Sequence, residues 1–286
     1  RLEMLYKLDE RQQRVVRAIL PMFRKYEDGV ADFWVKVYAE YFKAPECKEA
    51  ALVVGMFERA VHERFYDKIN KVFGTDTDEH YLSYLQDPIF KERAKWLGDT
   101  LKGDDKHATC LVYGLVEGVS LFSMFSLLRS FQSKGYNLIA TTVKGTKQSS
   151  MDEILHSDLL ATSFNYLYSE KGIKLTDDIK YYEVLKDQTS VVVENEKYIL
   201  TQLLKEDGVA IENSKFNGVN VTDYFGLVEM LANDYHKKLG CDELPYPDAK
   251  SSIYDWFISS SVGYSDPDFF GKGANKEYES AWNEDA

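Results

Sequence analysis

Acidic and imidazole side chains recur at helical spacing in three separate segments of this 286-residue chain. Glu153 and His156 are three residues apart and Glu58 and His62 are four apart, so each pair lies on one face of a helix. Glu117 stands in an otherwise apolar helical segment, where a carboxylate is costly unless it is paired or binds a metal. Carboxylates and imidazoles that converge from several helices suit iron or manganese.

Glu27 lies near the end of the first expected helix and could face the same centre. Two Glu/His pairs and two further carboxylates on separate helices form the ligand set of a dimetal carboxylate bundle. The three cysteines form no CxxC pair, which argues against structural zinc, an iron–sulfur cluster and a disulfide framework. The alternative for the first pair is a solvated charged face, which the neighbouring Arg59 and Arg64 would suit.

The elements that must position these residues are helices. Six prolines leave long stretches unbroken, and apolar residues recur at helical spacing through most of them. We expect helices at 8–26, 29–42, 47–72, 87–102, 106–134, 151–170, 177–205 and 221–239. Polar loops are expected at 74–81 and 135–150. The absence of an alternating strand set predicts an all-α helical bundle.

We expect one domain over residues 1–258 and a flexible tail over 259–286. The tail is dense in Ser, Gly, Asp, Asn and Lys, and such a composition buries too little apolar area to offset its ordering entropy. Its isolated aromatic residues predict a segment that docks on a partner.

The formal net charge of −12 disfavours binding to nucleic acids and to anionic membranes, since both depend on basic residues. No apolar run reaches the roughly 18–20 residues that span a bilayer, and the N-terminus is too charged for a signal peptide. We therefore expect a cytoplasmic protein that binds neither nucleic acid nor membrane.

Three segments resemble the small, radical-generating subunit of class I ribonucleotide reductase, a ferritin-like family. They are KLDERQQRVVRAILPMFRKYEDG at 7–29, VEGVSLFSMFSLLRSFQSKG at 116–135 and SMDEILH at 150–156. Further segments, among them FFGKGANKEY at 269–278, follow in the family's order, so that the resemblance spans nearly the whole chain.

The resemblance implies two metal ions per chain, with Fe/Fe favoured over Mn/Fe or Mn/Mn. The implied ligands are Glu27, Glu58, His62, Glu117, Glu153 and His156. Asp152 matches the family's aspartate that hydrogen-bonds the first histidine and helps relay the radical, although it could be an ordinary helix N-terminal acid. Tyr278 matches the tyrosine of the tail that docks on the catalytic large subunit. The family also implies a homodimer.

Two departures from the family leave alternatives open. The family usually has Asp at the position of Glu27, and its first Glu/His pair has two intervening residues, not three. Either a one-residue helical bulge returns Glu58 to the site, or one carboxylate ligand is lost and Arg59 supplies a positive charge there. The same shift leaves the radical position between Tyr66 and Phe65. With Phe65 there, the oxidising equivalent would stay on the metals; Tyr66 is favoured because it lies one helical turn past His62.

The family also has a Trp shortly before the first carboxylate helix, and residues 1–10 do not supply it. Rival interpretations are a dimetal oxidase without a reductase partner, an iron-storing ferritin relative, and a metal-deficient small subunit or helical interaction protein. Metal content and activation by a large subunit would separate these alternatives.

Overall fold

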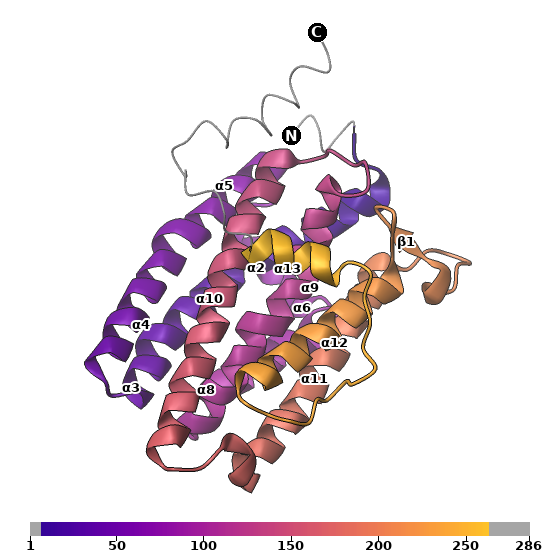
Figure 1. The fold of residues 1–286 in the computed structure, drawn as a ribbon. Coiled ribbons are helices and arrows are strands. Elements are labelled where there is room, and N and C mark those ends of the chain that lie inside the picture. Colours follow the sequence, from indigo (N-terminus) through magenta and orange to yellow (C-terminus); the bar gives the residue numbers. More distant parts are fainter. Residues whose placement is uncertain (1–6, 263–286) are drawn as a thin grey trace, which may run out of the picture.

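The computed structural model describes residues 7–262 (Figure 1). The first helical run of the chain begins with a capping box at Asp9. The Asp9 carboxylate accepts from the amide of Gln12, and the Gln12 side chain accepts from the amide of Asp9. Helix α2 (Glu10–Phe33) then continues through the π-helical segment η1 (Trp34–Tyr38) into α3 (Ala39–Tyr41). Its large apolar side chains between Val15 and Phe23 are fully buried: Val15, Val16, Ile19, Leu20, Met22 and Phe23.

The other helical runs follow in order. The second run joins α4 (Pro45–Phe57), the π-helical η2 (Glu58–His62) and α5 (Glu63–Phe73), and it is followed by α6 (Asp78–Gln86) and α7 (Lys91–Lys102). The third joins α8 (Lys106–Leu115), the π-helical η3 (Val116–Ser120), α9 (Leu121–Arg129) and the 3-10 turn η4 (Ser130–Gln132). The remaining helices are α10 (Ala140–Glu170), η5 (Leu175–Asp177), α11 (Ile179–Leu204), η6 (Ile211–Asn213), α12 (Val221–Lys238) and α13 (Tyr254–Val262).

The long helices pack side by side as a bundle (Figure 1). Helix α2 contacts α4 and α5, and α10 contacts α8, η3 and α9. Helices α11 and α12 pack on each other and against the central third run. A two-stranded antiparallel ribbon of β1 (Lys215–Phe216) and β2 (Val219–Asn220) lies beside them. The expected ferritin-like, all-α bundle is confirmed.

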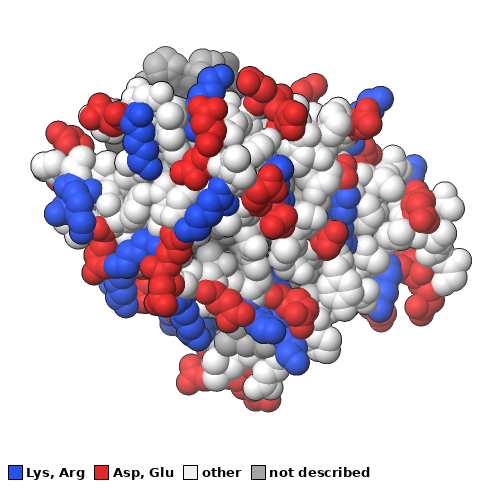
Figure 2. Space-filling view, turned by 90° about the horizontal axis from the view of Figure 1, so that it is seen from below, with Lys and Arg blue, Asp and Glu red and all other residues white. Residues whose placement is uncertain are grey.

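The third run is the central helix of the bundle. Contrary to the expectation from the sequence, the helical residues Lys106–Gln132 are long and apolar enough to cross a membrane, but 94% of an 18-residue apolar window within them is buried inside the protein, as in a core helix. Acidic and basic side chains are interspersed over the face shown in Figure 2. That face therefore offers no broad surface of a single charge.

Several expected boundaries were wrong. Residues 8–26 and 29–42 form one unbroken run, so Glu27 lies within a helix and not at its end. The polar segments 74–81 and 135–150 were expected as loops, yet α6 begins at Asp78 and α10 at Ala140. Low helix propensity predicted the second loop, but Thr142, Thr146 and Ser150 are buried against the bundle, and such packing overrides propensity.

Helix α13 runs past the expected domain boundary at residue 258. Residues 263–286, which include Tyr278 and most of the predicted docking tail, lie outside the described residues.

Candidate metal centre

The six predicted ligands come together in the middle of the bundle. Helix α2 contributes Glu27, the second run Glu58 and His62, the third run Glu117, and α10 both Glu153 and His156. All six are buried, with at most 3% of each residue exposed. Their donor atoms form two groups, one of Glu27, Glu58, His62 and Glu153 and another of Glu117, Glu153 and His156, each within 4.8 Å. Because Glu153 belongs to both groups, the two halves form one centre.

The first half of the centre is built around His62. Its Nδ1 lies 2.8 Å from Oε2 of Glu58, 3.8 Å from Oε1 of Glu153 and 3.9 Å from Oε2 of Glu27. Carboxylates from three different helices therefore surround one ring nitrogen.

The second half is built around His156. Its Nδ1 lies 2.9 Å from Oε2 of Glu153 and 3.8 Å from Oε2 of Glu117. Its Nε2 lies 3.6 Å from Oε1 of Glu58. Glu58 and Glu153 thus each present one oxygen toward His62 and the other toward His156.

A π-helical turn brings Glu58 into the centre. In η2 the amide of Glu63 donates to the carbonyl of Glu58, a bond that spans five residues instead of four. The turn accommodates the extra residue between Glu58 and His62, so both side chains point inward. Arg59 points outward and bonds Asp28 (3.2 Å) and Asp32 (3.0 Å). The structure therefore has the bulge, and Arg59 lies outside the site.

The π-helical segments η1 and η3 also each contain a residue at the candidate metal centre. Segment η3 contains Glu117. Segment η1 begins at Trp34, whose indole Nε1 donates to Oε1 of Glu117 at 3.1 Å. Local π turns at functional sites are a recurrent feature of helical proteins, and here three of them lie around one cluster.

The carboxylates have unused bonding capacity. One oxygen in each of Glu27, Glu58, Glu117 and Glu153 is buried without a hydrogen-bond partner among the described residues. Buried polar atoms are normally satisfied, and four orphaned oxygens around one point call for a ligand. The donor set of carboxylates and imidazoles suits iron or manganese. The residues present therefore fit a pair of divalent cations.

The pKa shifts of the buried carboxylates also indicate a site for cations. Burial and the charge of Glu58 raise the pKa of Glu27 well above its usual range, and burial and the charge of Glu117 do the same for Glu153. Burial alone would lower the pKa of His156, but its hydrogen bond with Glu117 and the charges of Glu117, Glu58 and Asp152 together raise it. Without cations the cluster must hold protons to offset the repulsion between its carboxylates. Bound cations would replace those protons.

Asp152 lies beside the centre. Its Oδ2 is 3.0 Å from Nε2 of His62, and about a third of its side chain is exposed. Burial alone would lower the pKa of His62, but the hydrogen bonds with Asp152 and Glu58 raise it to about 9. A carboxylate on the far ring nitrogen fixes the tautomer that leaves Nδ1 free for a metal.

The two aromatic candidates after His62 have different environments. Tyr66 is fully buried and stacks on Phe23 at 5.0 Å, and its hydroxyl has no hydrogen-bond partner in the described part of the chain. Burial, followed by the charge of Glu27, raises the pKa of Tyr66 well above its usual range. Phe65 is half-buried, and its ring lies against Gly145 of α10. Of the two candidates, Tyr66 is therefore the buried and oxidisable one, and it lies next to the carboxylates.

Sequence reasoning missed two aromatic residues at the centre. Trp34 lies seven residues after Glu27, a spacing that returns to the same helix face and could have drawn attention to it. Tyr113 lies four residues before Glu117, and its buried hydroxyl also has no hydrogen-bond partner within residues 7–262. Burial and the charge of Glu117 raise the pKa of Tyr113 well above its usual range.

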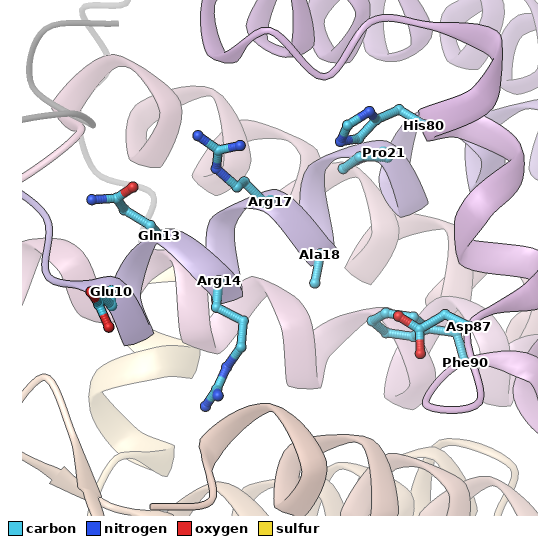
Figure 3. A pocket seen from close by; sticks show the side chains of 9 residues that line it. All are labelled: Glu10, Gln13, Arg14, Arg17, Ala18, Pro21, His80, Asp87 and Phe90. Carbon is cyan, nitrogen blue, oxygen red and sulfur yellow. The ribbon is translucent and has the colours of Figure 1, made fainter.

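The centre is separate from the surface pockets. A pocket of about 490 Å³ lies along the outer face of α2, where Arg14, Arg17 and Pro21 line it together with His80 and Asp87 from the neighbouring segments (Figure 3). It contains none of the six ligands. The candidate metal centre is therefore buried inside the bundle, away from this pocket.

Comparison with known proteins gives the family. The sequence model described as "Ribonucleotide reductase, small chain" matches residues 3–251. No curated protein matches in sequence. A structure from Bacillus halodurans, described as a class I ribonucleotide reductase, is 20% identical with a TM-score of 0.74 and covers 89% of each chain. The ribonucleotide reductase R2 subunit from Clostridium botulinum is 17% identical with a TM-score of 0.69, over 89% of this chain and 78% of that one. This chain belongs to the ribonucleotide reductase small-chain family.

Proposed function

We propose that this chain binds two metal ions at the six-residue centre and uses them to generate an oxidising equivalent that is held at Tyr66. The observation that carries the proposal is the set of four buried carboxylate oxygens, from Glu27, Glu58, Glu117 and Glu153, that lack hydrogen-bond partners within residues 7–262. When bound, the metals supply the oxidation by reacting with an oxygen species. An iron pair is favoured, with manganese–iron or manganese pairs as alternatives.

The protein residues hold the centre and move the proton. Glu58 and Glu153, together with Glu27, His62, Glu117 and His156, would hold the cations. Asp152 would accept the Nε2 proton of His62, which keeps Nδ1 available as a ligand. Tyr66 would give up one electron to the centre and its phenolic proton to the carboxylate cluster. The charge of Glu27 acts on the Tyr66 phenol more strongly than that of any other group, so Glu27 is the proposed acceptor.

Small subunits of this family normally work with a large subunit, and the equivalent held here would serve the reduction of ribonucleotides there. We propose ribonucleoside diphosphates as the substrate class. The C-terminal tail would dock on the large subunit, Tyr278 would carry the radical across the interface, and the small subunit would be a cytoplasmic homodimer.

The test is elemental analysis of protein loaded with iron and manganese, followed by electron paramagnetic resonance after exposure to oxygen. About two metals per chain and a tyrosyl signal that is lost in Tyr66→Phe would support the proposal. Tyr113→Phe is the matched control, because it removes the other unpartnered phenol beside the cluster and should leave the signal in place. Absence of bound metal under every loading condition would overturn the proposal.

A further inference from the structure

A row of oxidisable side chains leads away from the metal centre along the first helical run. Trp34 donates to the ligand Glu117, and its ring centroid lies 4.6 Å from that of Tyr38. Tyr41 follows three residues later on the same helical run, at a spacing that makes the two phenols neighbours on its surface. Both tyrosines also contact Phe42, with centroid distances of 4.7 and 4.8 Å. Ring contacts are therefore continuous from Trp34 through Tyr38 and Phe42 to Tyr41.

The row ends at a proton acceptor. The Tyr41 hydroxyl donates to Nδ1 of His107 at 2.5 Å. Burial, followed by the charge of Lys171, lowers the pKa of His107 to about 4, so the ring is neutral at neutral pH and this nitrogen is free to accept. The Tyr41 phenol itself is protonated, because burial raises its pKa to about 12. A phenol hydrogen-bonded to a neutral imidazole can lose its proton as it loses an electron, which avoids a high-energy cationic intermediate.

The proton has a further route beyond His107. The Nε2 of His107 lies 3.0 Å from the hydroxyl of Tyr168, and that hydroxyl donates to Oδ2 of Asp178 at 3.2 Å. Tyr181 stacks on the imidazole at 3.7 Å and holds its ring in place. A phenol, an imidazole, a second phenol and a half-buried carboxylate thus form one hydrogen-bonded chain.

These groups come from four elements that gather at one end of the bundle. The end of α3, the start of α8, the end of α10 and the start of α11 lie together there (Figure 1). Asp152, by contrast, lies near the middle of the bundle beside His62. The row that begins at Trp34 therefore leaves the centre from the Glu117 half, separately from the His62–Asp152 half.

We propose that Tyr41 and His107 form a second redox-active pair, joined to the metal centre by Trp34 and Tyr38, through which an oxidising equivalent can leave the centre. In the balanced step, one electron passes from Tyr41 through Tyr38 and Trp34 to the oxidised centre, and Trp34 and Tyr38 end in their starting states with their own protons in place. Tyr41 becomes a neutral tyrosyl radical as its proton moves to Nδ1 of His107. The imidazolium then passes its Nε2 proton to Tyr168, whose own hydroxyl proton moves to Asp178.

The inference rests on the proposed function for its oxidant, but the hydrogen-bonded pair exists without metal. Its first test therefore uses the metal-free chain, with 3-fluorotyrosine placed at position 41 and observed by ¹⁹F NMR. The His107→Phe variant keeps a ring in the same space and removes the acceptor, so the fluorine resonance should shift. An unchanged resonance in a variant with an unchanged circular dichroism spectrum would overturn the pairing.

The second test uses the metal-loaded Tyr66→Phe chain, which lacks the proposed main holder of the equivalent. After exposure to oxygen it should give a tyrosyl resonance that narrows when the tyrosines are ring-deuterated. Adding Tyr41→Phe should abolish this signal, and adding His107→Phe should weaken it and shorten its lifetime. Adding Tyr166→Phe should leave it unchanged, because Tyr166 is a largely exposed phenol on the same bundle.

Metal content is measured in each variant, so that a lost signal is not mistaken for a lost cofactor. A signal that survives Tyr41→Phe and disappears with Tyr113→Phe would overturn the inference while leaving the proposed function intact. If the chain binds metal and forms the Tyr66 radical but never gives a Tyr41-dependent signal, the inference is likewise overturned and the proposed function stands. A chain that binds no metal would overturn the proposed function and remove the oxidant for Tyr41.

Discussion

At the scale of single residues, Glu58 and Arg59 have opposite roles although they are adjacent. Glu58 is fully buried between the two histidines, whereas nearly half of the Arg59 side chain is exposed. Glu58→Gln keeps the shape of the side chain and removes its charge. We expect the affinity for the metals to fall by at least about tenfold, because even supporting groups of a metal site contribute that much.

Arg59→Gln is the matched control for that change. Its ion pairs with Asp28 and Asp32 are exposed, so their loss should cost only about 0–1 kcal/mol and leave metal binding unchanged. Isothermal titration with Mn²⁺ measures both variants. Loss of metal from Arg59→Gln, with Glu58→Gln unaffected, would mean that the carboxylate is not a ligand.

The protonation of His62 makes both the stability of the metal-free chain and its metal affinity depend on pH. The His62 pKa of about 9 in the metal-free chain lies above the ordinary value of 6.5, so the ring is protonated at neutral pH and stabilises the folded state. That stabilisation is complete below about pH 6.5, is lost as the pH rises through about 9, and amounts to at most about 3 kcal/mol. The metal competes with the Nδ1 proton, so metal affinity should rise over the same range.

Thermal unfolding of the metal-free chain and Mn²⁺ titration, each carried out from neutral pH to about pH 9, measure these two trends. Asp152→Asn removes the charge that helps to raise the pKa of His62, and it should move both trends to lower pH. Metal affinity that is independent of pH in the unmodified chain would show that His62 releases no proton on binding.

At the scale of the elements, the π turn in η2 explains the unusual spacing of Glu58 and His62. Deletion of the exposed Ala60 should convert this turn into regular α-helix and leave both side chains facing inward. Deletion of Arg64, which lies beyond the π turn, should rotate Tyr66 and the rest of α5 by about 100° relative to the site. We expect the first variant to keep its metals and the second to lose the tyrosyl signal.

Circular dichroism, metal analysis and electron paramagnetic resonance of the two deletion variants check this expectation. Equal damage from both deletions would mean that the π turn is required as such, and that it does more than accommodate one extra residue.

Close packing of α8 on α12 gives a second prediction at this scale. A Cβ on Gly114 would collide with the ring and hydroxyl of Tyr235, and that hydroxyl donates to the carbonyl of Leu111. Gly114→Ala should therefore destabilise the fold by about 1–3 kcal/mol. Gly98→Ala, at a helical position in α7 with nothing within 4 Å, should stabilise it by about 0.5–1 kcal/mol.

Chemical denaturation of the two glycine variants under identical conditions compares these effects. A destabilised Gly98→Ala would mean that helix propensity does not determine the stability of α7. A neutral Gly114→Ala would mean that α12 can move away from α8 at little cost.

The sequence predicted these elements well where apolar periodicity is strong and poorly where packing determines the structure. The central helix and α11 follow from their apolar pattern, and the pairing of Glu153 with His156 follows from simple helical spacing. The start of α10 could not be predicted, since its Thr and Ser residues become helical only by packing on neighbours. The contribution of Trp34 depends on how the first and third helical runs cross, and no single segment encodes that arrangement.

At the scale of the whole molecule, α13 is the last described helix and packs on the bundle. Its Phe257 is fully buried, and the guanidinium of Arg129 donates to the Phe257 carbonyl at 3.2 Å and lies 4.4 Å from the Phe257 ring. The expected tail from residue 259 would cut this helix near its middle. The effect of a C-terminal truncation on stability therefore depends on whether it removes α13, which the polar composition of residues 259–286 did not suggest.

Removal of residues 263–286 should leave the melting temperature and metal content unchanged, because every contact of α13 that the structure describes is kept. Reductase activity with a large subunit should be abolished, since the proposed docking segment and Tyr278 are gone. Removal of residues 254–286 should in addition lower stability by about 3–5 kcal/mol, as expected when a buried Phe is lost from a core. Calorimetry, metal analysis and an activity assay on both truncations separate the two effects, and full activity after the shorter truncation would show that radical transfer does not require the tail.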